Sequence, residues 1–346
     1  MRPIAEAYKD FPILHKEHNG HRVIYLDSGA TAQIPQSVID RVVEHMTQRN
    51  GNPHRGSHIL AIEASEDYEN ARDRVVEFIN AREREEVIFT RNSTESMNLI
   101  AHSYGLHNVK KGDKIVITVA EHHANLVTWQ YVAEQTGATL EYMYLDEHGH
   151  LKDGEINKID EKTKIVAFAH VSNVLGMEFP VKELTEKAHS VGAIVVLDGA
   201  QSTPHKKIDV QALDCDFFVF SGHKMCASQG IGVLYGKRDL LETMPPFLLG
   251  GDMIEYVKEQ TATFNELPYK FEAGTPNADG AVSLHAAIDY LESFGMDAIE
   301  AYEEELVAYI LPKIVELPHV HVIGSQNPKE KHGVIAFVPV TIVHNH

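Results

Sequence analysis

The stretch AIVVLDGAQSTPHKKIDVQALDCDFFVFSGHK, residues 193–224, contains two short apolar runs that each end in polar residues. The first run, AIVVLD, ends at Asp198, and the second, DFFVFSG, ends just before His223 and Lys224. Continuous β-branched and aromatic runs of this length are typical of strands that are buried on both faces, as in a parallel sheet. The carboxyl ends of parallel strands meet at one edge of the sheet, where open α/β folds bind their ligands. The stretch therefore predicts an α/β fold with Asp198 and Lys224 at the same edge.

Similar runs alternate with helical patterns along most of the chain, which predicts a large, mainly parallel sheet of seven to eight strands covered on both faces. The six other strands are expected at residues 23–26, 87–90, 114–118, 140–145, 164–170 and 232–236. Helices are expected between them, for example over residues 93–103, 124–135 and 181–190. Crossovers of this length suit βαβ units.

The pattern changes after Pro245, Pro246 and the glycine pair Gly250 and Gly251. The remaining chain predicts helices over residues 281–294 and 296–317 and strands over residues 319–324 and 333–340. We therefore predict a large domain over residues 20–260 and a smaller α+β domain built from residues 1–19 and 261–346. Two strands and two helices are few for an independent layer, so we expect the small domain to be incomplete at its C-terminus.

The composition limits which classes of partner and which cellular compartment are expected for the protein. With 31 Lys and Arg against 50 Asp and Glu, the net charge of −19 argues against nucleic acid or an anionic membrane surface as a partner. The chain shows neither a signal-peptide pattern nor an apolar stretch of membrane-spanning length, so we expect a cytoplasmic protein. The two cysteines, Cys215 and Cys226, are too few for a disulfide framework and lack zinc-site spacing.

Lys224 and Asp198 are the two residue types that a pyridoxal phosphate (PLP) site requires. A lysine at the end of a buried strand loses its proton more easily through desolvation and can form a Schiff base with an aldehyde. A carboxylate at a neighbouring strand end can keep a pyridine nitrogen protonated, so that the ring withdraws electrons. Gln201, Ser221 and His223 stand beside this pair in the sequence.

Other strand ends carry further polar candidates. After residues 87–90, Ser93 and Thr94 open a helix whose free N–H groups could receive a phosphate, although for this motif alone a plain helix cap is the favoured explanation. After residues 114–118, His122 and His123 could stack on a ring and move protons, or could simply be surface residues. Asn173 could bind a ligand oxygen or serve as a turn residue. We expect no metal site, because adjacent histidines diverge and no third ligand stands at a recognisable spacing.

The order STES, EHHAN, SNVLG, DGAQS, SGHK, GIGVLYG and FEAGTPN resembles the class V aminotransferase superfamily of PLP enzymes. Within it, the order of motifs is most similar to the SufS-like (group II) cysteine desulfurases, and HRGSH and FEAGTPN are typical of the branch of desulfurases and selenocysteine lyases. The resemblance extends from YLDSGAT at Tyr25 to VHNH at residues 343–346. It implies the PLP-dependent transferase fold of the aspartate aminotransferase type. It also implies conversion of L-cysteine to L-alanine, with the sulfur passed to a protein persulfide for iron–sulfur cluster assembly and a sulfur-acceptor protein as a further partner.

The resemblance also implies roles for individual residues. Lys224 would form the Schiff base and remove the α-proton, and Asp198 would pair with the pyridine nitrogen. The remaining implied contacts are Gln201 to the ring hydroxyl, His123 stacked on the ring, Ser93, Thr94, Ser221 and His223 around the phosphate, and Asn173 near the substrate. Thr275 of FEAGTPN would reach the phosphate of a neighbouring subunit, which implies a homodimer.

The sequence also departs from the family pattern. The family's nucleophilic cysteine and its carboxylate-binding arginine have no counterpart in this sequence, so we expect the chain to be part of a parent enzyme with a longer C-terminus. We expect Cys215 and Cys226 to be packing residues, with Cys226 as a relocated nucleophile the less favoured alternative. MCASQG at residues 225–230 is expected to alter the loop at the phosphate, and Asn92 replaces a usual glycine, which suggests a left-handed backbone.

Three other functions compete with cysteine desulfuration: a selenocysteine lyase acting on L-selenocysteine, another class V PLP activity, and a non-catalytic scaffold that binds a sulfur-acceptor protein. The enzymes share the cofactor site and differ in the fate of the substrate. The scaffold would keep the fold without turnover.

Overall fold

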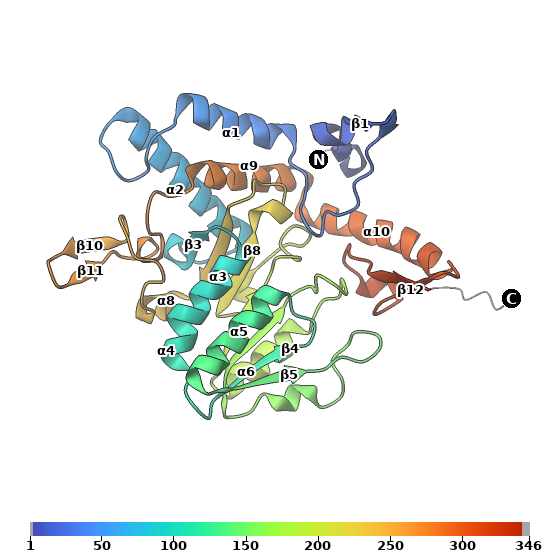
Figure 1. Ribbon diagram of the computed structural model, residues 1–346. Helices are drawn as coiled ribbons and strands as arrows, with labels where there is room; N and C mark the ends of the chain where they lie inside the picture. Colours follow the sequence, from blue (N-terminus) through green and yellow to red (C-terminus); the bar gives the residue numbers. More distant parts are fainter. Residues whose placement is uncertain (1–2, 341–346) are drawn as a thin grey trace.

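A seven-stranded sheet forms the centre of the chain in a computed structural model, which describes residues 3–340 (Figure 1). The strands are β3 (Val87–Thr90), β4 (Lys114–Thr118), β5 (Thr139–Met143), β6 (Thr163–Ala169), β7 (Ile194–Asp198), β8 (Phe217–Ser221) and β9 (Gly232–Gly236). Their order is β3-β9-β8-β7-β6-β4-β5. Strand β9 is antiparallel to β3 and β8, and the other pairs are parallel. The prediction of a large, mainly parallel sheet is therefore confirmed.

The sheet is apolar on both faces because side chains alternate along each strand. In β8, Phe218 and Phe220 belong to one hydrophobic cluster, whereas Phe217 and Val219 belong to the cluster on the opposite face. All four side chains are fully buried. This two-sided burial explains why the strands appear in the sequence as continuous apolar runs.

Helices cover each face of the sheet. One face packs against α3 (Ser93–Ile100), α5 (His123–Thr136) and α8 (Arg238–Thr243), which contribute residues to the same cluster as Phe217. Helix α3 continues through a π-helical turn, Ala101–Gly105, into α4 (Leu106–Asn108). The other face packs against α1 (Gln36–Gln48), α2 (Ile59–Ile79), α6 (Val181–Ser190), α7 (Val210–Leu213) and α9 (Ala278–Phe294).

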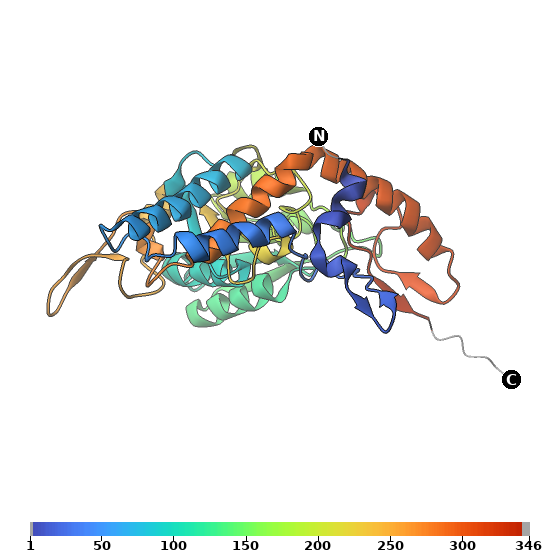
Figure 2. The same ribbon diagram turned by 90° about the horizontal axis from the view of Figure 1, so that it is seen from above.

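A smaller lobe lies at one end of the molecule (Figure 2). It contains α10 (Met296–Val315) and a hairpin of β12 (Val320–Val322) with β13 (Phe337–Pro339), near a short hairpin of β1 (Glu17–His18) with β2 (His21–Arg22). A third hairpin, β10 (Ile254–Val257) with β11 (Ala262–Phe264), extends away from the body (Figure 1). The predicted division of the chain at residue 260 stays a prediction, although α9 shares the hydrophobic core of the sheet.

Two local predictions are wrong. Residues 23–26 form no strand. Ile24 and Leu26 are 79% and 90% exposed, so these apolar side chains are not packed between the sheet and its helices. The sheet therefore has seven strands. Asn92 has an extended backbone, with φ −177°, and its side chain caps α3 by accepting the Glu95 N–H at 3.0 Å. The residue is asparagine because of this cap, and the left-handed conformation is not used.

Candidate functional site

A cavity of about 650 Å³ opens at the carboxyl ends of the central strands. Its wall combines strand ends, the segment after β2 and three residues of the small lobe. The lining residues are Leu26, Asp27, Gly29, Ala30, Asn92, Ser93, Thr94, His122, Asn173, Gln201, Ser221, His223, Lys224, Gly333, Val334 and Ile335. Most of the residues that were predicted from strand ends therefore line one cavity.

Lys224 is the cationic group of this cavity. It ends the 3-10 turn Gly222–Lys224 that directly follows β8. The turn is tight, because a Cβ atom at Gly222 would lie 2.7 Å from Ile231 Cγ2. Burial lowers the pKa of the Lys224 amine, and the charge of Asp198 opposes this shift. A larger fraction of the Lys224 amine is therefore neutral than in water.

Asp198 lies just behind the cavity wall, at the end of β7. Its side chain is buried, and one carboxylate oxygen accepts the Ala200 N–H at 3.0 Å. Burial raises the pKa of Asp198, while the Ala200 N–H, Lys224 and His122 lower it. The carboxylate is thus a desolvated acid that a positive charge in the cavity would keep ionised.

The start of α3 forms another part of the wall. The Ser93 N–H donates to Ser221 Oγ at 2.8 Å, and Ser221 Oγ donates to Ser93 Oγ at 2.9 Å. Ser93 and Thr94 are the first two residues of the helix, so their hydroxyls lie at its positive end. A helix start with two hydroxyls and the Ser221 hydroxyl is suited to an anion such as a phosphate.

Of the two adjacent histidines, His122 lines the cavity and His123 is not among the lining residues. His122 is the N-cap of α5, where its Nδ1 accepts the Ala124 N–H at 3.1 Å. In the neutral ring the proton therefore resides on Nε2. Burial lowers the pKa of His122, and Lys224 lowers it further, whereas the charge of Asp198 raises it. His123 is the first residue of α5 and does not line this cavity, so its stacking on a cofactor ring stays a prediction.

Three further predicted residues, Gln201, His223 and Asn173, line the cavity. Gln201 Nε2 donates to the Gly29 carbonyl at 2.8 Å. His223 Nδ1 lies 3.1 Å from Thr31 Oγ1, and Asn173 lines the wall after β6. Sequence reasoning assigned no role to the segment around Gly29 or to residues 333–335. Only the SGAT tetrapeptide at residues 28–31 gave a signal for the first of these.

Thr275 lies away from the Lys224 cavity. It lines a separate cavity of about 470 Å³ that also contains Thr90, Arg91 and Glu272. Glu272, three residues before Thr275, is fixed by Arg72: its two carboxylate oxygens accept hydrogen bonds from the guanidinium group at 2.7 and 2.9 Å. The contact of Thr275 with a neighbouring subunit stays a prediction.

Neither cysteine has the properties of a nucleophile. Cys215 is buried, and its desolvation raises the pKa of the thiol. Cys226 packs against the hydrophobic core, and burial raises the pKa of its thiol to about 12. Thiolates attack sulfur and thiols do not, so the raised pKa values disfavour both groups as nucleophiles.

We expect Cys226→Ser to leave turnover of an amino-acid substrate within about twofold of the unmodified protein, because the thiol is a packing group. Product formation measured under identical cofactor loading tests this. Cys215→Ser serves as the matched variant at the fully buried position. A loss of turnover specific to Cys226→Ser, with cofactor still bound, would show that Cys226 takes part in the reaction.

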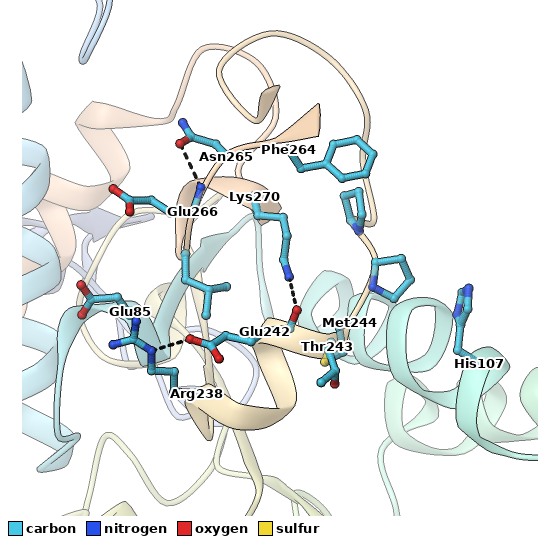
Figure 3. Close-up of a pocket in the computed structure, with 13 residues that line it drawn as sticks. Glu85, His107, Arg238, Glu242, Thr243, Met244, Phe264, Asn265, Glu266 and Lys270 are labelled. Carbon is cyan, nitrogen blue, oxygen red and sulfur yellow. Dashed lines mark hydrogen bonds and ion pairs between the residues drawn. The ribbon is translucent and has the colours of Figure 1, made fainter. Parts of the chain in front are cut away.

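A larger cavity, of about 700 Å³, lies elsewhere, beside α8 (Figure 3). Two of its cationic groups are engaged with their neighbours. Lys270 Nζ donates to the Leu241 carbonyl at 2.7 Å, and Arg238 Nε donates to Glu242 Oε1 at 2.7 Å. These contacts close the end of α8 and hold the helix.

Two further findings concern residues 3–340. No group of three or more His, Cys, Asp or Glu side chains is placed to hold a metal ion. No helix in this part of the chain is long and apolar enough to cross a membrane.

Comparison with known proteins gives a consistent result. Residues 24–346 match the family described as aminotransferase class-V. The chain is 51% identical to a probable cysteine desulfurase of Halalkalibacterium halodurans over 342 residues, which cover 99% of this chain and 83% of that protein. It superimposes with a TM-score of 0.92 on an apo cysteine desulfurase from Thermococcus onnurineus NA1, at 39% identity over 99% of this chain and 84% of that one. A cysteine desulfurase from Escherichia coli gives a TM-score of 0.88 at 36% identity, again over 99% and 84%.

Proposed function

The chain belongs to the class-V aminotransferase family, and from this premise we propose that it is a PLP-dependent cysteine desulfurase. The observation that carries the proposal is the pairing of Lys224 with the buried Asp198 at the ends of two adjacent strands, with the start of α3 on the same cavity. The high similarity to cysteine desulfurases over nearly the whole chain supports the choice of reaction.

The cavity fits PLP in both volume and donor set. A volume of about 650 Å³ lies within the range of small-molecule cofactor sites. The start of α3, with the hydroxyls of Ser93, Thr94 and Ser221, matches a phosphate. Lys224 matches the aldehyde, and the buried Asp198 carboxylate matches a protonated pyridine nitrogen.

When bound, PLP supplies an electron sink for negative charge at the substrate α-carbon. Lys224 has a lowered pKa through burial, so a larger fraction of its amine is neutral and able to accept the α-proton. Asp198 supplies a fixed negative charge that burial shields from water. His122 places an Nε2–H donor on the wall, because its Nδ1 is occupied by the Ala124 N–H.

The overall reaction converts L-cysteine and a thiol into L-alanine and a persulfide. The carbon–sulfur bond of the substrate breaks, and a hydrogen takes the place of sulfur on the β-carbon. A sulfur–sulfur bond forms on the acceptor thiol, which is thereby oxidised. Cys215 and Cys226 are unsuited to this role because burial raises the pKa of both thiols. The assay therefore supplies an external thiol.

Several finer assignments are part of the same proposal. We propose a homodimer in which Thr275 serves the neighbouring subunit, since this residue is remote from its own Lys224 cavity. The group II assignment, delivery of sulfur to an acceptor protein for iron–sulfur clusters, and a cytoplasmic location remain predictions from the sequence. L-Selenocysteine is the alternative substrate.

The direct test is to load the purified chain with PLP and incubate it with L-cysteine and dithiothreitol as the sulfur acceptor. We expect equal amounts of alanine and of reducible sulfur, which dithiothreitol releases as sulfide. Bound PLP with no alanine from L-cysteine, while L-selenocysteine yields alanine, would establish the lyase in its place. Failure with both substrates would favour the scaffold.

We expect His122→Ala and His123→Ala to differ strongly. His122→Ala removes the donor on the cavity wall and should lower kcat by about 10²-fold, the usual scale for one proton-transferring or positioning group. His123→Ala changes a residue outside the wall and should stay within about twofold. Alanine formation and the visible spectrum of bound PLP are measured for both. The reverse order of effects would restore His123 as the functional residue.

A further inference from the structure

Residues 332–335, here termed the wall segment, belong to the small lobe, and the last three of them line the Lys224 cavity. The segment lies directly on the turn that follows β6. The His332 N–H donates to the Gly176 carbonyl at 2.7 Å. Gly176 has φ +63°, and a Cβ atom there would lie 2.3 Å from the Val334 carbonyl oxygen. Only glycine permits this approach, so the wall segment has one close-fitting seat on the large domain.

Glu178 is the centre of an ionic network beside this seat. Its Oε1 lies 3.2 Å from His170 Nε2, and its Oε2 pairs with Lys206 Nζ and lies 3.5 Å from His332 Nε2. Lys206 Nζ also lies 3.2 Å from Glu300 Oε1. These groups come from the end of β6, the chain after β7, the wall segment and α10. One carboxylate therefore joins the edge of the sheet to the small lobe.

The network is partly shielded from water. The side chains of Lys206 and His332 are 16% and 14% exposed, and that of Glu178 is 36% exposed. Burial would raise the pKa of Glu178, but His170 and Lys206 outweigh it and hold the pKa at about 2. Glu178 is therefore ionised at neutral pH. Shared, half-buried ion pairs of this kind hold geometry better than isolated surface pairs.

Neighbouring contacts also connect the small lobe to the large domain beside the wall segment. His205 Nδ1 lies 2.5 Å from Glu303 Oε2, and a Cβ atom at Gly333 would lie 2.6 Å from Glu303 Oε1. The buried Lys331 donates from Nζ to the Leu175 carbonyl at 2.6 Å. The wall segment is thus flanked on both sides by polar contacts that connect it to the large domain and to α10.

We infer that Glu178 is a positioning residue that fixes the wall segment on the cavity and thereby sets the affinity for the amino-acid substrate. Glu178 itself does not line the cavity, so it acts through the wall segment. The inference rests on the proposed function for its kinetic consequence, because the substrate is the amino acid of that reaction. Its structural consequence, a firmly seated wall segment, is independent of that function.

The experiment uses Glu178→Gln, which keeps the size of the side chain and removes its charge, and Lys206→Met, which disrupts the network from the other side. In PLP-loaded protein, hydrogen–deuterium exchange of a peptide covering residues 332–336 should be about tenfold faster in both variants, because the His332 and Val334 amides lose a stable seat. The KM for L-cysteine should rise by about tenfold with kcat within about twofold, because the groups at the reacting atoms are unchanged.

Glu186→Gln is the matched control, since Glu186 in α6 pairs only weakly with Lys182, at 3.9 Å, on the exposed surface. It should change neither exchange nor KM. Unchanged exchange at residues 332–336 in both network variants, or a fall in kcat at constant KM, would overturn the inference. If the unmodified protein forms no alanine, the proposed function fails, whereas the exchange measurement still decides whether Glu178 holds the wall segment.

Discussion

Lys224→Ala is expected to remove the visible absorbance band of the PLP-loaded protein and to lower alanine formation by about 10³-fold or more, because it deletes both the covalent attachment and the base. The amine of Lys224 follows β8 directly and lines the cavity. Burial lowers the pKa of this amine, and the charge of Asp198 opposes that shift. No other lysine lines this cavity within residues 3–340.

Lys270→Met provides the matched control for this experiment. Lys270 is another half-buried lysine whose pKa is lowered by burial, but it closes α8 beside a different cavity (Figure 3). This variant should keep the absorbance band and turnover, with at most a modest loss of stability. If Lys224→Ala retained the band of the unmodified protein, PLP would be attached elsewhere and the proposed function would lose its basis.

The strand ends could be predicted from the sequence because a parallel sheet brings its carboxyl ends together whatever the detailed packing. Asp198, Asn173 and Ser221 came from such ends, and the structure places all three at one cavity or directly behind its wall. The choice between His122 and His123 could not be predicted in the same way. It depends on the residue at which α5 begins, and helix boundaries are set by local capping contacts that the pattern alone does not resolve.

Contacts between segments that are distant in the sequence could not be predicted either. Residues 23–26 look like a strand, yet Leu26 is exposed on the cavity side because no neighbouring strand is available to pair with it. The wall segment reaches the cavity through contacts with distant residues, among them Gly176, which lies more than 150 residues earlier in the chain. Apolar periodicity reports burial along one element and carries no information about which distant segment will cover it.

Asp198→Asn should retain PLP on Lys224 but lower kcat by about 10²- to 10³-fold, the scale on which one fixed charge in a desolvated site contributes to a reaction. The amide keeps the shape of the side chain and can still accept the Ala200 N–H that Asp198 accepts at 3.0 Å. It cannot carry the negative charge that keeps a pyridine nitrogen protonated. The visible spectrum and kcat for L-cysteine, measured on the same preparation, separate binding from chemistry.

Asp216→Asn is the matched control, because Asp216 is an equally buried carboxylate at the opposite edge of the sheet. One of its oxygens accepts the Val195 N–H at 2.7 Å and lies 2.8 Å from His189 Nε2. This variant should lower thermal stability and leave kcat within about twofold, since its charge lies far from the reacting atoms. Asp198→Asn with unchanged kcat would show that the ring needs no charged partner. Equal losses in both variants would attribute the effect to the sheet and remove Asp198 from the chemistry.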